Sequence, residues 1–549
     1  MGLHSSFCLQ LAPGLQLALA AALEQAPEPR LITKSMFSAL SFLLVILPLG
    51  ASGPSRADDD ISYDIAHYDI VIRPDFHSKQ LSLRVGIAID NPKLEQDFFF
   101  DLNDRYESVT VTSDSSAVVS KRDPGSITVS VARPTKHFSL LFDLKGFPGK
   151  SRGEEREVIE DQSLFLLWSD RFYPIDFNDW ATVRTTIVLP SSFQAIAPGR
   201  LTGERGVSGG AEYTFEAAKP AVGFSVFADS RWIKSERRMN GLQMQTLLYP
   251  ESQQFAEQIF RTSSEILTFY SEIYCPYPFE QFSLITLTGM GARRAFAGFV
   301  GYEPGYLKRE LTTTGYDAHE TALLWWGYTV RGKGPGSSQW AEGFGDYAEI
   351  LYAEKYHKPV AKIFGYFREK YLATPAANDP LYSELRSSTN QEFVHGKYPW
   401  LMHLVRYVIG DRKFKRAMKL VFVKFKYRAF TMDDFLAALE QGSGRSLRWF
   451  RREWLERRGV PGIRLKSDVR KKRNGYLITC SLEQQGNLYH LPVDIGIETE
   501  KGMRIEKAHL EDIQTTVSFQ SKDKPKRVLL DPYHWVIMRK VQGPSTGTS

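Results

Sequence analysis

Alternating polar and apolar positions dominate the chain from Tyr63 to about Trp232. The runs are short and are separated by Gly, Pro, Asp or Asn: "YDIAHYDIVIRP", "LSLRVGIAID", "SITVSVA", "HFSLLFDLKG", "ATVRTTIVLP" and "AVGFSVFAD". A period of two with β-branched side chains is typical of strands that bury one face. We therefore expect an N-terminal antiparallel β domain over residues 61–235, built as a sandwich-like or saddle-shaped sheet.

The hydrophobic period lengthens to three or four residues after residue 250. "SQQFAEQIFRTSSEILTFYSEIY", beginning at Ser252, predicts an amphipathic helix, and "FSLITL" predicts a short apolar strand. A glycine-rich stretch at 289–305 precedes a helix that contains "HETALLWWGY". Helical patterns continue in "KIFGYFREKYL", "LMHLVRYVIG", "KFKRAMKLVFVKFKY" and "MDDFLAALEQ". These patterns predict a mostly helical central domain over 250–459.

Alternation returns in the last part of the chain. The runs "GYLITCSLEQ", "LPVDIGIETE", "TTVSFQS" and "RVLLDPYHWVIM" predict a smaller, sandwich-like C-terminal β domain over 460–540, followed by a disordered tail at 541–549. A chain of 549 residues is also too long for one core. The expected fold class is therefore α+β and multidomain.

The first 57 residues have the pattern of an export signal. Lys34 precedes the apolar run "MFSALSFLLVILPLG", and a small-x-small cleavage site ends at Ala57, before Asp58. The run is shorter than the roughly 20 residues that cross a bilayer, which favours cleavage over a membrane anchor. We expect translation to begin at Met36 and the protein to be exported, periplasmic or extracellular, with membrane contact only through an uncleaved leader.

Charge and cysteine content narrow the class of protein. Lys and Arg number 69 against 63 Asp and Glu, with both signs interspersed, so we expect no nucleic-acid partner. The basic segment 451–473 is interpreted as a solvated helix face that runs into a linker. Outside the leader the cysteines are Cys275 and Cys480; they form no metal-binding pair, although an exported protein could bridge them.

Residues 317–326, "DAHETALLWW", contain part of a zinc-binding pattern. His-Glu-x-x-His places two imidazoles one helical turn apart on one face, with the Glu as general base. His319 and Glu320 keep the first half, but Leu323 stands at the position of the second histidine. Because catalytic zinc normally has three protein ligands and a water, this leucine decides how the site is interpreted.

The segment "AHETALLWWGYTVRGKGPGSSQWAEGFGDYAEIL" resembles the membrane alanyl aminopeptidase family of gluzincins, which includes the leukotriene A hydrolases. The resemblance continues in "RFYPIDFNDWATVRTTIVLP" and "MDDFLAALEQGSGRSLRWFRREWLERRGVPGIRL" and covers roughly residues 61–540. In that family the Glu of an Asn-Glu-Gly-Phe motif completes the zinc site, and "AEGF" falls there. The resemblance thus implies a thermolysin-like domain with zinc on His319 and Glu342 and with Glu320 as catalytic base.

Other family positions differ in this chain. The Gly-Ala-Met-Glu-Asn loop, whose Glu holds the substrate's α-amino group, falls on "ARRAFAG", so Ala295 replaces that Glu. Arg293 and Arg294 beside it favour an acidic group on a bound substrate. The family's transition-state tyrosine falls on His395, which can still donate a hydrogen bond to an oxyanion; a shifted alignment places Tyr398 there.

Two residues are candidates to replace the missing zinc ligand. Asp346 lies one turn after Glu342, and His403 lies on a later helix. The alternatives are an Asp346 that orients a ligand or faces solvent, and a His403 that is a buried core residue. Zinc is therefore an expected cofactor with an incomplete site.

Three functions remain open. The favoured one is an exported, aminopeptidase-like protein with lost or impaired zinc-dependent hydrolysis, whose cleft binds a peptide or protein ligand or acts as a scaffold. The second is an active zinc aminopeptidase or hydrolase with a substituted metal ligand. The third is an interaction module that uses the terminal β domains.

Overall fold

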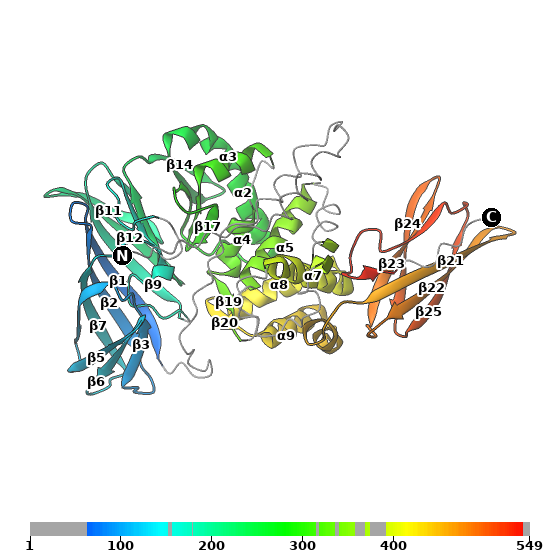
Figure 1. Ribbon diagram of the computed structural model, residues 1–549, viewed down its shortest axis with the longest axis horizontal. Helices are drawn as coiled ribbons and strands as arrows, with labels where there is room; N and C mark the ends of the chain where they lie inside the picture. The colour runs from blue at the N-terminus through cyan, green and yellow to red at the C-terminus, as the bar shows by residue number, and fades with distance from the viewer. Residues whose placement is uncertain are drawn as a thin grey trace, which may run out of the picture. The chain divides into compact units, whose positions relative to one another are not determined.

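The computed structural model describes residues 63–151, 156–177, 179–313, 318–334, 340–356, 368–369, 371–373 and 391–541. All of them belong to one compact unit, residues 44–549. Figure 1 colours its first strands blue to cyan, its helices green to yellow, and its last strands orange to red. The expected leader, and the tail apart from residue 541, lie outside the described residues.

A seven-stranded sheet forms the main part of the N-terminal region, in the order β11-β12-β9-β1-β2-β7-β4. The strands are β1 (Asp64–Asp75), β2 (Gln80–Asp90), β4 (Tyr106–Ser113), β7 (His137–Gly146), β9 (Ala181–Leu189), β11 (Arg200–Val207) and β12 (Gly210–Ala221). Alternate residues such as Ile70 and Ile72 are buried, as the period of two predicts. The expectation of a wholly antiparallel sheet is wrong in one place. Strand β9, which follows β1 only after a long stretch of chain, pairs in parallel with β1, so the sheet is mixed.

Two three-stranded sheets complete this region. They are β3 (Asp97–Asp101), β6 (Ser126–Val131) and β5 (Val118–Asp123), and β10 (Gln194–Ile196), β13 (Val226–Asp229) and β8 (Ser163–Leu166). The run "AVGFSVFAD" forms a strand only in its last part, because Gly223 has a left-handed φ of 72°. Phe227 of β13 packs against Phe296, with ring centroids 4.9 Å apart, and so contacts the hairpin that carries the two arginines.

A five-stranded sheet opens the central region, in the order β14-β15-β16-β18-β17. Its strands are β14 (Ile233–Met239), β15 (Leu242–Leu248), β16 (Gln281–Thr286), β17 (Arg293–Phe296) and β18 (Phe299–Tyr302). The predicted "FSLITL" strand is β16, which is buried along its length between two parallel partners. In the β17–β18 hairpin, Arg293 pairs with Tyr302 and Ala295 with Val300.

Helices make up most of the rest of the central region. They are α2 (Ala256–Ile273), α3 (Pro304–Thr313), α4 (His319–Trp326), α5 (Trp340–Lys355), α7 (Gln391–Ile409), α8 (Asp411–Phe425), α9 (Met432–Ser443) and the short α10 (Arg448–Phe450). A 3-10 turn at Pro250–Phe255 precedes α2 and takes up the predicted Ser252 start. The helix expected from "KIFGYFREKYL" falls largely outside the described residues. Within the described part, no helix has the length and apolar character needed to cross a membrane.

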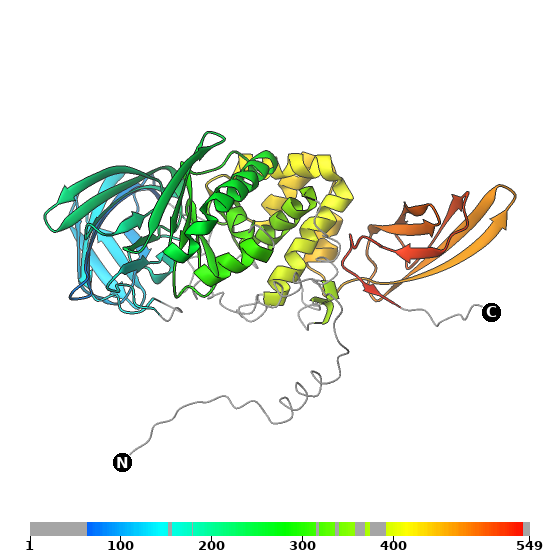
Figure 2. The ribbon, with the colours of Figure 1, turned by 90° about the horizontal axis from the view of Figure 1, so that it is seen from above.

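Two sheets form the C-terminal region, with the orders β25-β22-β21-β27 and β24-β23-β26; Figure 2 shows them in orange and red. The strands are β21 (Gly462–Lys472), β22 (Gly475–Gln485), β23 (Leu491–Thr499), β24 (Gly502–Leu510), β25 (Gln514–Ser521), β26 (Arg527–Leu530) and β27 (Arg539–Lys540). The expected strand through "RVLLDPYHWVIM" ends at Leu530, because Asp531 turns to a φ of 44°. Cys275 and Cys480 are free thiols, so the bridge considered above is not formed.

Candidate functional site

Helices α4 and α5 carry the residues of the expected zinc site. His319 and Glu320 begin α4, whose residues are all buried. Glu342 and Asp346 lie one turn apart in the first half of α5. Because residues four apart share a helix face, both carboxylates of α5 point the same way.

The His319 imidazole lies between these two carboxylates. Its Nε2 is 3.1 Å from Glu342 Oε2, and its Nδ1 is 2.9 Å from Asp346 Oδ1. Only 3% of the His319 side chain is exposed. Burial by itself lowers the pKa of His319, but the carboxylates of Asp346 and Glu342 outweigh it and raise the pKa well above its ordinary value. The ring is therefore held as an imidazolium with a proton on each nitrogen.

Leu323 borders the same space as the imidazole. Gly345 of α5 faces it: a Cβ atom at Gly345 would lie 2.9 Å from Leu323 Cδ2 and 3.1 Å from His319 Cε1. The absence of a side chain at residue 345 is what lets α5 lie against both residues. The position of the second zinc ligand is thus filled by a buried methyl group, which offers no lone pair to a cation.

Glu320 is paired with Arg293 of β17. Arg293 Nε lies 3.2 Å from Glu320 Oε1, and the two side chains are 9% and 8% exposed. The Arg293 guanidinium also lies 5.4 Å from the centroid of the Tyr306 ring. The expected general base and one of the two arginines expected to bind substrate therefore bind each other.

Tyr328 connects Ala295 to the N-terminal region. Its hydroxyl donates to the Ala295 carbonyl at 2.8 Å, and Trp168 Nε1 donates to the same hydroxyl at 3.4 Å. Burial raises the pKa of Tyr328 to about 12, so the phenol is neutral. No pattern in the sequence marks Tyr328 as a functional residue, although it directly follows the "HETALLWWG" segment. Its hydrogen bonds fix the strand that stands where the family holds a substrate's amino group.

The donor set does not fit a catalytic zinc ion. His319 Nε2 and Glu342 supply two donors, whereas Asp346 faces the opposite ring nitrogen and cannot join the same ion through it. Leu323 supplies none. Across the ranges that the structure describes, no group of three or more His, Cys, Asp or Glu side chains is placed to hold a metal ion. Two donors fall short of the three protein ligands that catalytic zinc normally has.

The other candidates lie on α7. His403 is buried, its ring stacks on Trp535 at 4.2 Å, and its Nδ1 lies 3.3 Å from Tyr347 Oη. Burial lowers the pKa of His403 well below its ordinary value, so it is a neutral core histidine. Tyr398 is also buried. The side chain of His395 lies outside the described residues, so its role as an oxyanion donor stays a prediction.

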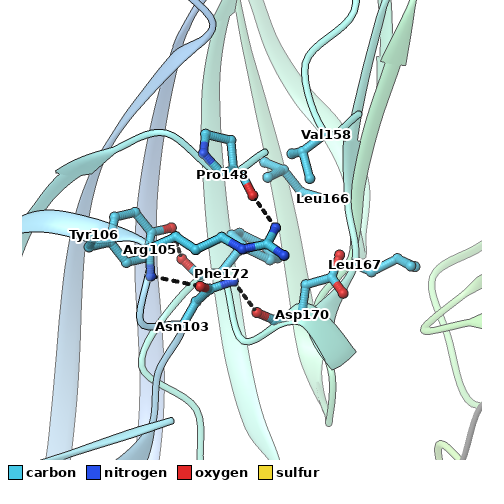
Figure 3. Close-up of a pocket in the computed structure, with 9 residues that line it drawn as sticks. All are labelled: Asn103, Arg105, Tyr106, Pro148, Val158, Leu166, Leu167, Asp170 and Phe172. Atoms are coloured by element: carbon cyan, nitrogen blue, oxygen red, sulfur yellow. Dashed lines mark hydrogen bonds between the residues drawn. The ribbon is translucent and has the colours of Figure 1, made fainter. Parts of the chain in front are cut away.

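A small cavity in the N-terminal region shares no residue with this site (Figure 3). Its volume is about 10 Å³, which is room for roughly one water molecule. Arg105 and Asp170 are among its lining residues, and Arg105 donates to the Pro148 carbonyl across it. The cavity is too small for an amino acid, so it is not a candidate substrate site.

The sequence matches a peptidase family in its central region. Residues 307–454 match the Peptidase family M1 domain. The chain is 27% identical over 218 residues to aminopeptidase N of Lactococcus lactis subsp. lactis, covering 36% of this chain and 25% of that protein. It is 31% identical over 88 residues to aminopeptidase N of Escherichia coli (strain K12), covering 16% and 10%. The matches thus span a quarter or less of these relatives.

Solved structures show the same fold over a longer stretch. An M1 zinc metallopeptidase from Deinococcus radiodurans superposes with a TM-score of 0.60 at 18% identity, covering 70% of this chain and 92% of that one. Legionella pneumophila aminopeptidase A, solved in complex with aspartic acid, gives 0.70 at 12% identity, covering 88% and 60%. These likenesses concern the fold, a multidomain α+β chain with a β-rich N-terminal region and a helical region. With the domain match and the motif residues, they confirm the resemblance to the M1 aminopeptidase family of the gluzincin metallopeptidases, whose domain residues 307–454 match.

Proposed function

We propose that this chain is an exported, aminopeptidase-like protein whose zinc-dependent peptide hydrolysis is lost, and that the former active-site region serves a binding or scaffold role. The proposal keeps the expected organisation: a β domain over 61–235, a thermolysin-like domain over 250–459 and a sandwich-like domain over 460–540. Export rests on the leader pattern that ends at residue 57.

The arrangement around His319 carries this proposal. The imidazole nitrogens face carboxylates on opposite sides, and Leu323 fills the third ligand position. In the family's chemistry, zinc lowers the pKa of a bound water to about 7 so that a carboxylate can deprotonate it. Among the described residues, two donors face the metal position and Glu320 is bound to Arg293, which supports a site that no longer prepares that nucleophile.

The charges nearby favour an acidic ligand group. A substrate's α-ammonium group would meet the buried Ala295 in place of a carboxylate, beside the positive charge of Arg294. We propose that a carboxylate of a peptide or protein ligand binds next to Arg294, since opposite charges set the orientation of binding. Arg293 adds little to this charge, because Glu320 neutralises it.

One observation favours a second function, an active zinc aminopeptidase or hydrolase with a substituted ligand. His319 Nε2 and Glu342 Oε2 are 3.1 Å apart, a separation that two ligands of one ion can have. His319, Glu320 and Glu342 are also retained together. Under this alternative a further donor completes the site.

A hydrolysis assay separates the two. The mature chain, with zinc added, is incubated with a series of aminoacyl-coumarin amides, beside a Glu320→Gln variant. Loss of hydrolysis predicts the same background rate for both proteins. A zinc-dependent rate that Glu320→Gln abolishes would establish the alternative and overturn the proposal.

A further inference from the structure

We propose that Arg293 is an internal cation that takes over the charge of the missing metal, and that it excludes zinc from this region even where a second histidine is supplied. The inference rests on the proposed loss of the zinc site and adds a second cause to it. Leu323 removes a ligand, whereas Arg293 supplies a competing positive charge.

The position of Arg293 is fixed from three sides. The β17–β18 register places it opposite Tyr302. Its guanidinium lies over the Tyr306 ring and its Nε lies 3.2 Å from Glu320 Oε1. Because both members of the pair are less than a tenth exposed, the guanidinium is directed into the protein rather than toward solvent.

The buried carboxylate of Glu320 requires such a cation. Its side chain is 8% exposed, whereas Asp346 and Glu342 have the His319 imidazole between them. Anions this far from water need a positive partner within a few ångströms. A bound metal would place positive charge in this region, and here Arg293 supplies positive charge to Glu320.

The positive charge of Arg293 also disfavours the binding of a zinc ion. His319 and Glu320 are consecutive residues of α4, so an ion held by His319 would be a second positive charge in a buried region where Glu320 already has the Arg293 guanidinium as its partner. Like charges repel more strongly in a buried setting than in water. Restoring a histidine at residue 323 is therefore expected to give weak zinc binding unless Arg293 is also removed.

Zinc affinity of three variants tests this inference. Leu323→His alone is compared with Leu323→His/Arg293→Met, which keeps an apolar stem against Tyr306. The matched control is Leu323→His/Arg309→Met, because Arg309 lies 4.4 Å from the same ring but has Glu310 as its ion-pair partner. Affinity is measured by competition with a chromophoric chelator, and thermal unfolding followed by circular dichroism checks that each variant is folded. If Arg293→Met unfolds the protein, Arg293→Gln removes the charge while keeping a hydrogen-bond donor.

We expect zinc to bind the Arg293→Met double variant about a hundredfold more tightly than Leu323→His alone or the Arg309→Met control, given the strength of buried charge repulsion. Equal affinity in all three variants would overturn the inference. A folded double variant that binds no zinc would overturn it too, since the arginine would then not be the obstacle. Neither result bears on the proposed function. The proposed function fails if the unaltered chain hydrolyses substrates at a rate that Glu320→Gln abolishes.

Discussion

Arg293 of strand β17 and Glu320 of helix α4 form a buried ion pair, with 3.2 Å between Nε and Oε1. In the family pattern, the position of Glu320 acts on water and the strand near Arg293 holds the substrate. Here the two side chains satisfy each other. The pair therefore links the proposed loss of catalysis to the stability of the central region.

Breaking this pair should destabilise the protein. Arg293→Met leaves the Glu320 carboxylate buried without its arginine, and loss of one partner of a buried pair costs about 3–5 kcal/mol of unfolding free energy. Arg293→Met/Glu320→Gln should recover most of the loss, because no unpaired charge remains. Urea unfolding of the three proteins measures this.

The control for that prediction is an exposed pair. Arg84 and Asp143 lie 2.8 Å apart with side chains 62% and 48% exposed, so Arg84→Met should cost about 0–1 kcal/mol. If Arg293→Met and Arg84→Met lower the free energy of unfolding by the same small amount, the Arg293–Glu320 pair does not stabilise the protein as described.

A side chain at residue 345 should disturb the contact between α4 and α5. The Cβ of Gly345→Ala would lie 2.9 Å from Leu323 Cδ2, and such overpacking costs about 1–3 kcal/mol. Leu323→Ala in the same chain should relieve that strain. Gly305→Ala in α3 is the matched control: its Cβ meets no atom within 4 Å, so it should stabilise the helix by up to about 1 kcal/mol. A Gly345→Ala protein as stable as Gly305→Ala would contradict the packing described.

Stability should depend on pH through His319. Its pKa is raised in the folded chain by Asp346 and Glu342 against the effect of burial, so the folded state binds a proton more tightly than the unfolded state. The resulting stabilisation is fully present below about pH 6.5, the unfolded value, and is lost as pH rises through the folded pKa. The difference in unfolding free energy between the unaltered chain and His319→Gln should therefore shrink as pH rises above about 6.5. A difference that is constant or grows with pH would count against a protonated His319.

Export should leave a defined N-terminus. The leader pattern predicts cleavage after Ala57, so the secreted chain should begin at Asp58. Mass spectrometry of the protein purified from the extracellular or periplasmic fraction checks this. Recovery of a chain that retains residues 37–57 would favour a membrane anchor, and any peptide from upstream of Met36 would refute the proposed start site.

Patterns in the sequence predicted many of the elements but not the pairing of side chains. The period of two predicted β1 and β2, and the His-Glu and "AEGF" motifs predicted that His319 and Glu342 approach each other, which they do at 3.1 Å. The partner of Arg293 depends on how β17 packs against α4, a contact between segments that no local pattern encodes. For the same reason, no local pattern indicates that Gly345 lies against Leu323.

The most direct test of the account is the zinc content of the chain from Asp58 onward, measured by elemental mass spectrometry. A Glu342→Ala variant is measured in parallel. The account predicts no stoichiometric zinc in either protein. Among the residues that the structure describes, His319 and Glu342 are the two donors at this position, Leu323 stands where a third ligand is needed, and Arg293 already supplies a positive charge to Glu320. One zinc per chain that disappears in Glu342→Ala would contradict it and would show that another residue completes the metal site.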